Sequence, residues 1–143
     1  MAFAALVMLT ASRKGEILRI KLTDIHDNHL LILDQKTGKK AYYLKTPALE
    51  AAIEMAIDSQ KVGSDYLLPN TKGECHMNKD DRCQPFDKSW RRSMERAIKN
   101  TDLQESFTRH DLRAKVGSDA ETEGRAQELL GHTTADMTRK HYR

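Results

Sequence analysis

The chain has 143 residues, of which 38% are hydrophobic and 31% are charged. A chain of this length can bury a sizeable core, and its regular apolar patterns exclude a disordered protein. The net charge of +3, from 24 basic and 21 acidic residues, is too small to identify a polyanionic partner by itself. We therefore expect one domain over residues 1–143.

The chain begins with an apolar run, MAFAALVMLTA, from Met1 to Ala11. This run is too short to span a bilayer, and no basic segment precedes it as in a signal peptide. It predicts a buried helix, and its abrupt start suggests a fragment of a longer chain. Ser12 is the expected N-cap of a second helix. The apolar positions expected on that helix are Ile17, Leu18, Ile20 and Leu22.

Two strands and a third helix are expected next. HLLILD and KAYYLK alternate as strands do, and Gly38 in the intervening QKTGK supplies the turn conformation. Pro47 opens a helix that continues to about Ser59. Its apolar positions have helical spacing: Leu49, Ala52, Ile53, Ala56 and Ile57.

The second half of the chain is expected to be helical, after a short extended DYLLP. A helix from about Pro85 to Lys99 presents its apolar side through Phe86, Trp90, Met94, Ala97 and Ile98. Three short helices follow, around 108–118, around 124–130, where Gly131 stops the helix, and from about 134 to the end. The predicted fold class is α+β, mainly helical, with a small antiparallel sheet.

Two cysteines lie in the polar stretch ECHMNKDDRC. Cys75, His76 and Cys83 would give a zinc ion only three ligands at irregular spacing, whereas structural zinc sites use four in paired motifs. Free thiols in a reducing cytoplasm are the preferred interpretation.

Basic residues are concentrated in two stretches. KTGKKAYYLK holds four lysines and no acid, and KSWRRSMERAIK holds five basic residues against Glu95. These stretches indicate a basic surface, although a solvated helix face has the same composition.

Arg13 and Lys36 are the first candidates for chemistry. A cation at the start of a helix opposes the helix dipole, so Arg13 either forms an ordinary salt bridge with Glu16 or is placed to grip a phosphate. Lys36 is either a solvated turn residue or a general acid carried on a mobile hairpin tip.

FTRHDLRAK supplies a second set of candidates. His110 and Arg113 are three residues apart and share one face of the expected helix, with Leu112 directed toward the core and Thr108 as its cap. The His-Asp dipeptide alone would also suit a metal-dependent phosphohydrolase, but further ligands at helical spacing are missing from the sequence.

The last stretch, LLGHTTADMTRKHYR, holds two more candidates. His132 follows a helix-ending glycine and either packs there or faces a ligand. Tyr142 stands among basic residues, and it either anchors a last turn or acts as a nucleophile.

Taken in order, these residues resemble the active site of the tyrosine recombinase (phage integrase) family. The matching segments are TASRKGEILRIKLTDI, QKTGKK, TRHDLRAKVGSDA and LLGHTTADMTRKHYR. Two departures are visible. Ala11 stands where the family commonly has glycine, and the spacing from His132 to Tyr142 is one residue longer than in many members.

The resemblance implies a role for each matched residue. Tyr142 would attack a DNA phosphodiester and form a 3′-phosphotyrosyl bond. Arg13 and Arg113 would hold the non-bridging oxygens, and Glu16 would orient its neighbours. His110 would assist proton removal from the phenol, His132 would donate a hydrogen bond to the phosphate, and Lys36 would protonate the leaving 5′ oxygen. No metal or other cofactor is implied.

The implied partner is double-stranded DNA, contacted through its backbone by Lys39, Lys40, Lys45, Arg91 and Arg92. The resemblance implies a homotetramer on DNA for the full-length protein, with this fragment a monomer in isolation, in the cytoplasm of a bacterial or phage-infected cell. It also implies integration or excision of a phage or mobile element. Family members usually carry a separate N-terminal DNA-clamping domain. The alternatives are a non-catalytic helical DNA-binding module that reads DNA through residues 90–96, and a type IB topoisomerase-like relaxase. A metal-dependent phosphohydrolase is a further alternative.

Overall fold

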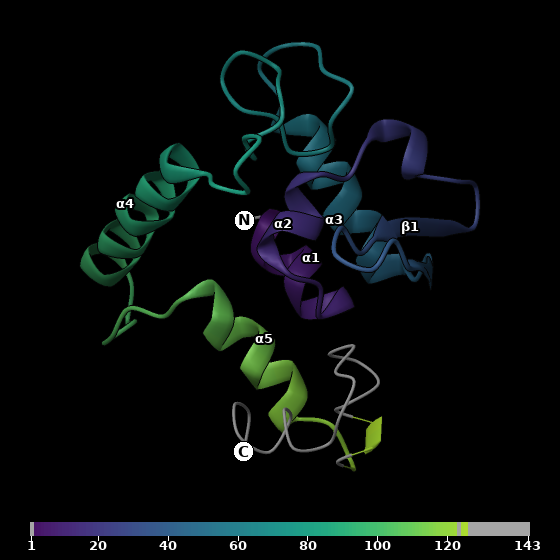
Figure 1. The fold of residues 1–143 in the computed structure, drawn as a ribbon. Coiled ribbons are helices and arrows are strands. Elements are labelled where there is room, and N and C mark those ends of the chain that lie inside the picture. Colours follow the sequence, from purple (N-terminus) through teal and green to yellow (C-terminus); the bar gives the residue numbers. More distant parts are fainter. Residues whose placement is uncertain (1, 123, 126–143) are drawn as a thin grey trace.

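The computed structural model describes residues 2–122 and 124–125 (Figure 1). Its elements, in chain order, are α1 (Ala2–Thr10), α2 (Lys14–Leu18), a 3-10 turn η1 (Leu22–Asp24), β1 (His29–Leu33), β2 (Lys40–Leu44), α3 (Pro47–Asp58), α4 (Gln84–Asn100) and α5 (Arg109–Ser118). The mainly helical α+β class with a small antiparallel sheet is therefore confirmed. Within the described part of the chain, no helix is long and apolar enough to cross a membrane.

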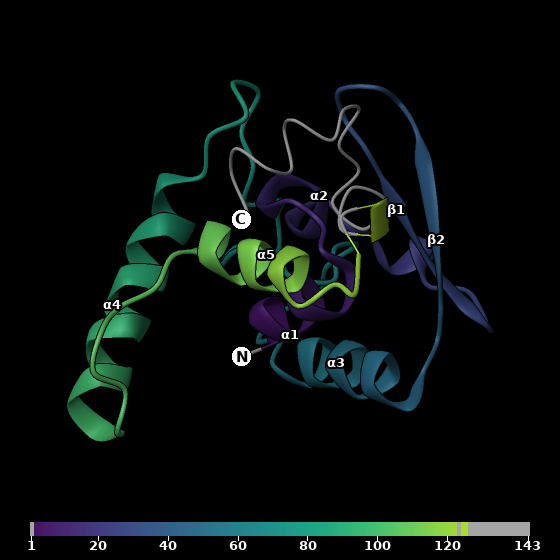
Figure 2. The same ribbon diagram turned by 90° about the horizontal axis from the view of Figure 1, so that it is seen from below.

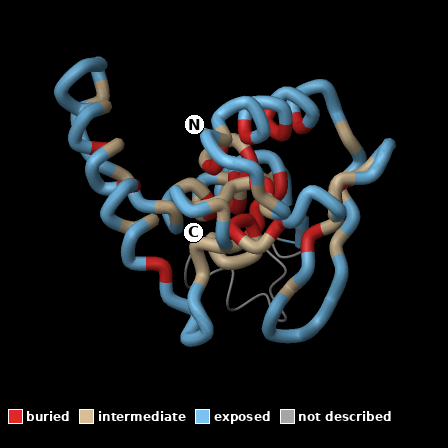
Figure 3. Tube along the Cα trace, turned by 90° about the horizontal axis from the view of Figure 1, so that it is seen from above, coloured by how far each residue is buried: buried red, intermediate tan, exposed pale blue. Residues whose placement is uncertain are grey.

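The apolar helix α1 lies at the centre of the core. It contacts α2, α3 and α5. Figure 3 shows most of the buried residues gathered in the middle of the trace. Leu6 and Val7 are 0% and 2% exposed, as the sequence predicted for this apolar run. Because α1 contacts both α2 and α5, it fixes the relative positions of the two elements that carry the candidate residues.

The turn between α1 and α2 differs from the prediction. The N-cap of α2 is Arg13, not Ser12, because the Glu16 carboxylate accepts the Arg13 backbone N–H at 2.7 Å. Ala11 has a φ of 55°, in the left-handed region that favours glycine, which gives a physical reason for the family's usual residue there. Helix α2 ends at Leu18, so Ile20 and Leu22, which were predicted on it, both lie after its end. Ile20 is buried there, whereas Leu22 is 37% exposed in η1.

The predicted hairpin is confirmed. β1 and β2 pair antiparallel with Leu31 opposite Tyr42, and Gly38 in the connecting turn has a φ of 69°. Leu30 and Ile32 face the core and are buried, whereas the other face of the sheet remains more exposed. The hairpin tip therefore extends from a strand that is anchored in the core.

Helix α3 begins as predicted, with Thr46 accepting the Leu49 backbone N–H at 3.2 Å ahead of Pro47. Its buried side comprises Leu49, Ala52, Ile53 and Ala56, and the helix contacts α1. Ile57 is 44% exposed and does not belong to the buried side.

Helix α4 projects from the rest of the fold (Figure 2). Trp90 and Met94 are buried, and Trp90 lies edge-on to Phe3 of α1. Trp90 also donates its indole N–H to the Phe107 carbonyl oxygen at 3.2 Å. Ile98, predicted on the apolar side, is 38% exposed because the end of α4 extends past the core.

Helix α5 spans Arg109–Ser118 with Thr108 as its N-cap, as predicted. The helices expected around 124–130 and from about 134 lie outside the described residues, apart from positions 124–125.

Candidate functional site

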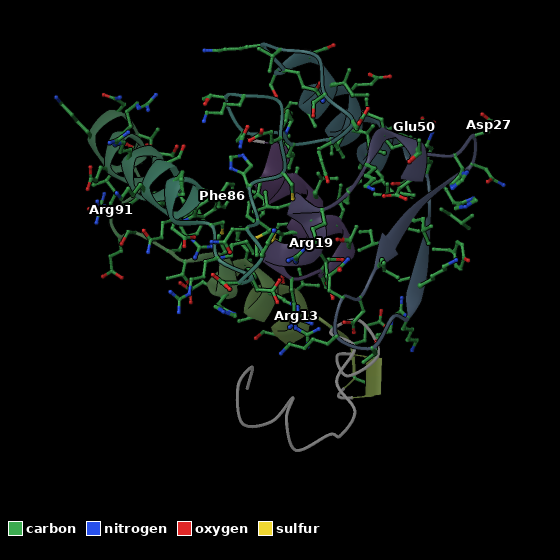
Figure 4. All side chains as sticks on the ribbon, turned by 45° about the horizontal axis from the view of Figure 1, so that its top comes forward. Arg13, Arg19, Asp27, Glu50, Phe86 and Arg91 are labelled. Atoms are coloured by element: carbon green, nitrogen blue, oxygen red, sulfur yellow. The ribbon has the colours of Figure 1, made fainter. Side chains whose placement is uncertain are left out.

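A pocket of about 260 Å³ opens beside the start of α2, the hairpin tip and the start of α5. Four of the six predicted catalytic residues and the supporting glutamate line it. They are Arg13, Glu16, Lys36, His110 and Arg113. His132 and Tyr142 lie outside the described residues. Figure 4 shows Arg13 and Arg19 near the centre of the molecule, away from Asp27 and Glu50.

Arg13 enters the pocket from the N-terminus of α2. Its guanidinium lies 3.5 Å from the Glu16 carboxylate, and the same carboxylate holds the Arg13 backbone. The Arg13 side chain is nevertheless 39% exposed. The salt bridge that the sequence offered as an alternative is therefore present, and it leaves the guanidinium open to a ligand.

Arg113 enters the pocket from α5 and is 6% exposed. Its Nε donates a hydrogen bond of 2.6 Å to the carbonyl oxygen of Ala11. A buried guanidinium is costly unless it is hydrogen-bonded. The left-handed turn at Ala11 therefore supplies an acceptor that helps to hold Arg113 in place.

His110 lies one turn before Arg113 on the same helix and is exposed at the pocket. The helix start is fixed by a capping box, in which Thr108 accepts from Asp111 and Asp111 accepts from Thr108. The hydrogen bond that the Thr108 backbone N–H donates to the Asp111 carboxylate, together with the Thr108 side chain, lowers the pKa of Asp111 and so favours the ionised cap. Leu112 packs against the core, as predicted.

Lys36 is at the hairpin tip, where Asp34 organises the turn. The Asp34 carboxylate accepts the backbone N–H of Lys36 at 2.9 Å and that of Thr37 at 3.4 Å. Burial raises the pKa of Asp34, but these donors and the Arg13 charge outweigh it, so the pKa is below 3.8. Asp34 and Lys36 both line the pocket, so the hairpin tip contributes to its wall.

Replacing Asp34 with alanine should loosen this tip. Each lost hydrogen bond is worth about 1 kcal/mol, or roughly fivefold faster amide exchange at Lys36. Asp34→Asn keeps an acceptor oxygen and should retain most of the protection. Since the folded pKa is lowered, the protection in the native protein should be complete above pH 3.8 and lost as the pH falls through the folded value. Equal exchange in the alanine variant and the native protein would show that Asp34 does not order the tip.

Three cationic pocket residues were not predicted from the sequence: Lys14, Arg19 and Arg109. Two of them adjoin a predicted residue in the chain, Lys14 next to Arg13 and Arg109 next to His110. Arg19 forms an ion pair with Asp81, and Lys14 and Arg109 both pair with Asp87. Only the packing of α2, α4 and the 72–82 loop brings these charges together, and the sequence carries no sign of it.

The predicted backbone-contact residues lie outside this pocket. Lys39 and Lys40 are exposed at the hairpin, Lys45 follows β2, and Arg91 and Arg92 are exposed on α4. Figure 4 shows Arg91 on α4, well apart from Arg13. These residues can contact a long ligand only if it extends across the molecule from the pocket.

The polar stretch from Glu74 to Cys83 holds the three residues weighed as zinc ligands, Cys75, His76 and Cys83. Both Cys75 and Cys83 are free. Across residues 2–122 and 124–125, no three His, Cys, Asp or Glu side chains are grouped so that they could hold a metal ion. Burial lowers the pKa of His76 despite a hydrogen bond with the Pro69 backbone, and its ring lies edge-on to Phe86.

The pocket is chemically suited to a phosphate ester. Six cationic side chains and three carboxylates line it, so positive charge predominates. Two guanidinium groups offer planar paired donors, an imidazole can move a proton, and an ammonium on a hairpin tip can deliver one.

The fold is that of a tyrosine recombinase catalytic domain. The structure is similar to XerA recombinase, with a TM-score of 0.73 and 18% identity over 99% of this chain and 52% of that one. It is also similar to a lambda integrase dimer bound to a COC′ core site, with a TM-score of 0.65 and 22% identity. That match covers 99% of this chain and 51% of the integrase chain. For the lambda integrase catalytic core the TM-score is 0.61 and the identity 22%, and the match covers 92% of this chain and 81% of that one. The chain thus spans about half the length of the first two relatives.

The family of the chain is established by a match to a sequence model. The model of the phage integrase family matches residues 1–143, so the chain belongs to that family. Among curated protein sequences, none is similar enough to count as a match.

Proposed function

We propose that this chain is the catalytic domain of a site-specific recombinase that cleaves and rejoins DNA through a 3′-phosphotyrosyl intermediate. One observation carries the proposal. Arg13, Lys36, His110 and Arg113 come from three separate parts of the chain, yet all four line one positively charged pocket.

In the proposed reaction, the phenol of Tyr142 attacks a backbone phosphorus and displaces the 5′ oxygen. Arg13 and Arg113 bind the non-bridging oxygens, and Glu16 keeps Arg13 oriented through the contacts described above. His110 assists deprotonation of the phenol, His132 donates a hydrogen bond to the phosphate, and the Lys36 ammonium protonates the leaving oxygen. The phosphotyrosyl bond retains the energy of the broken ester, so rejoining needs no nucleotide cofactor.

The magnitudes support a site of several groups. Phosphate-ester cleavage requires a barrier reduction of up to about 20 kcal/mol. One preorganised donor supplies about 3–4 kcal/mol. A phenol with a pKa near 10 is ionised in only about one molecule in a thousand at neutral pH. A single arginine is insufficient, whereas convergent cations both stabilise the transition state and favour the phenolate.

The proposed substrate is double-stranded DNA, and the proposed setting is a phage or other mobile element. Similar structures include lambda integrase tetramers on a Holliday junction and the Tn1549 transposon integrase with a circular intermediate DNA. We propose that the full-length protein likewise assembles as a tetramer on DNA, with an N-terminal clamping domain preceding this one. The lysines at 39, 40 and 45 and the arginines at 91 and 92 would contact the DNA backbone.

A covalent-trapping experiment tests the proposal. The 143-residue chain is incubated at low salt with a pool of nicked duplexes of random sequence, in which the cleaved fragment diffuses away and prevents rejoining. A covalent protein–DNA adduct should accumulate, and its attached peptide should contain Tyr142. A chelator should leave the yield unchanged, whereas a metal-dependent phosphohydrolase would lose activity. Cleavage without an adduct would overturn the proposal.

A further inference from the structure

The wall of the pocket beyond Arg13 and His110 holds a pair of cations that the proposed mechanism does not use. The Lys14 Nζ lies 3.2 Å, and the Arg109 Nη2 lies 3.0 Å, from the same oxygen of Asp87. Their side chains are only 26% and 24% exposed, so the packing around them limits their motion. Both line the pocket.

The charges of this cluster do not balance. Asp87 carries one negative charge against the two positive charges of Lys14 and Arg109. Arg109 is also the first residue of α5, where the helix dipole disfavours a cation and favours an anion. Asp111 supplies a carboxylate to the same first turn, but that carboxylate accepts the Thr108 backbone N–H, and Glu16 and Asp81 are paired with Arg13 and Arg19. Lys14 and Arg109 are therefore paired with Asp87, which balances only one of their two charges.

The chain itself determines where such an anion would lie. Lys14 directly follows Arg13 and Arg109 directly precedes His110, so the cluster adjoins the place where the proposed reacting phosphate binds. A nucleic-acid strand carries phosphates at regular short intervals. Because Lys14 and Arg109 line the same pocket as Arg13 and Arg113, a strand with one phosphate between the two arginines can place a neighbouring phosphate at this wall.

We propose that Lys14 and Arg109 together form a second subsite, which binds the backbone phosphate next to the one that is cleaved. This inference rests on the proposed function, and it deepens that function by assigning the strand's position across the pocket. In the free protein Asp87 holds the two cations in place. In the complex the phosphate neutralises the positive charge of Lys14 and Arg109 that Asp87 does not balance.

The salt dependence of DNA binding tests the subsite. Each neutralised phosphate contributes about 0.9 to the slope of log K against log salt. Binding to a short duplex of random sequence is measured by fluorescence anisotropy for the native chain, Lys14→Gln, Arg109→Gln and the double variant. Because the two side chains share one phosphate, the double variant should lose about 0.9 from the slope, not about twice that amount.

Two control variants separate charge from structure. Lys115→Gln removes an equal charge from α5, where Lys115 is exposed, pairs with Asp119 at 2.9 Å and does not line the pocket. Its slope should not change. Asp87→Asn breaks both ion pairs but keeps both cations, so its slope should stay the same or become steeper. If Asp87→Asn reduced the slope of log K against log salt as much as Arg109→Gln does, the subsite would be overturned. An unchanged slope in the double variant would overturn it as well.

The outcome is independent of the covalent chemistry. Native protein that forms a Tyr142 adduct, with slopes unaffected by the double variant, would contradict the subsite and leave the proposed function standing. If the double variant had a reduced slope but the native protein formed no adduct, the recombinase mechanism would be contradicted. The phosphate subsite formed by Lys14 and Arg109 would then still stand.

Discussion

Replacing Tyr142 with phenylalanine should abolish the covalent protein–DNA adduct while leaving DNA binding within about twofold of the native value. The substitution removes only the hydroxyl oxygen, which is the proposed nucleophile, so the phosphotyrosyl ester at this position cannot form. The measurement is the yield of adduct on nicked duplexes, separated by denaturing electrophoresis, together with binding by anisotropy.

Two other tyrosines make this test specific. Tyr42 is 64% exposed on the outer face of the sheet, and Tyr42→Phe should leave the adduct yield unchanged. Tyr43 lies beside Ser12, Glu16 and Arg113, and burial raises the pKa of its phenol, reinforced by the Glu16 charge and opposed by Ser12 and Arg113. A raised pKa disfavours the nucleophilic phenolate. An adduct that persists in Tyr142→Phe would remove the proposed role from Tyr142 and direct attention to Tyr43.

Replacing Arg113 should affect both catalysis and folding. Loss of one preorganised donor to a developing charge costs about 10²–10³ in rate. Arg113→Ala also leaves the buried carbonyl of Ala11 without its guanidinium donor, which should lower the free energy of unfolding by about 1.5–3 kcal/mol. The measurements are single-turnover adduct formation and urea denaturation.

Arg113→Lys distinguishes the two effects. Lysine keeps the charge but lacks the planar paired donors, so the variant should fold and still lose about a hundredfold in rate. Arg82→Lys is the matched control, since Arg82 is exposed and does not line the pocket. Native-like rates in a folded Arg113→Lys variant would show that only charge is required there.

The sequence predicted most of the fold because its local signals were strong. Gly38 between two alternating strands, Pro47 after Thr46, and the Thr108–Asp111 capping box each determine structure through contacts within a few residues. The start of α2 was predicted incorrectly because Ser12 looked like an N-cap, whereas Glu16 reaches back to Arg13 and takes that role. Exposed Ile57 and Ile98 show that helical spacing alone does not set the width of a buried stripe.

The candidate site was predicted in part, and for a different reason. The order of Arg13, Lys36, His110 and Arg113 suggested a shared pocket only through the family resemblance, since no local rule joins residues so far apart. Lys14, Arg19 and Arg109 could not be found that way. Their positions depend on ion pairs with Asp81 and Asp87, which come from the loop before α4 and from α4 itself and are far from α2 and α5 in the sequence.

The hydrogen bond between Arg113 and Ala11 joins residues 102 positions apart. During synthesis the acceptor leaves the ribosome long before helix α5 exists, so a nascent chain carries Arg13 without the opposing guanidinium. Under the proposed function, the two-arginine part of the pocket is therefore complete only after Arg113 has been synthesised. Truncated translation products that end before residue 113 would lack this guanidinium and the hydrogen bond that holds it.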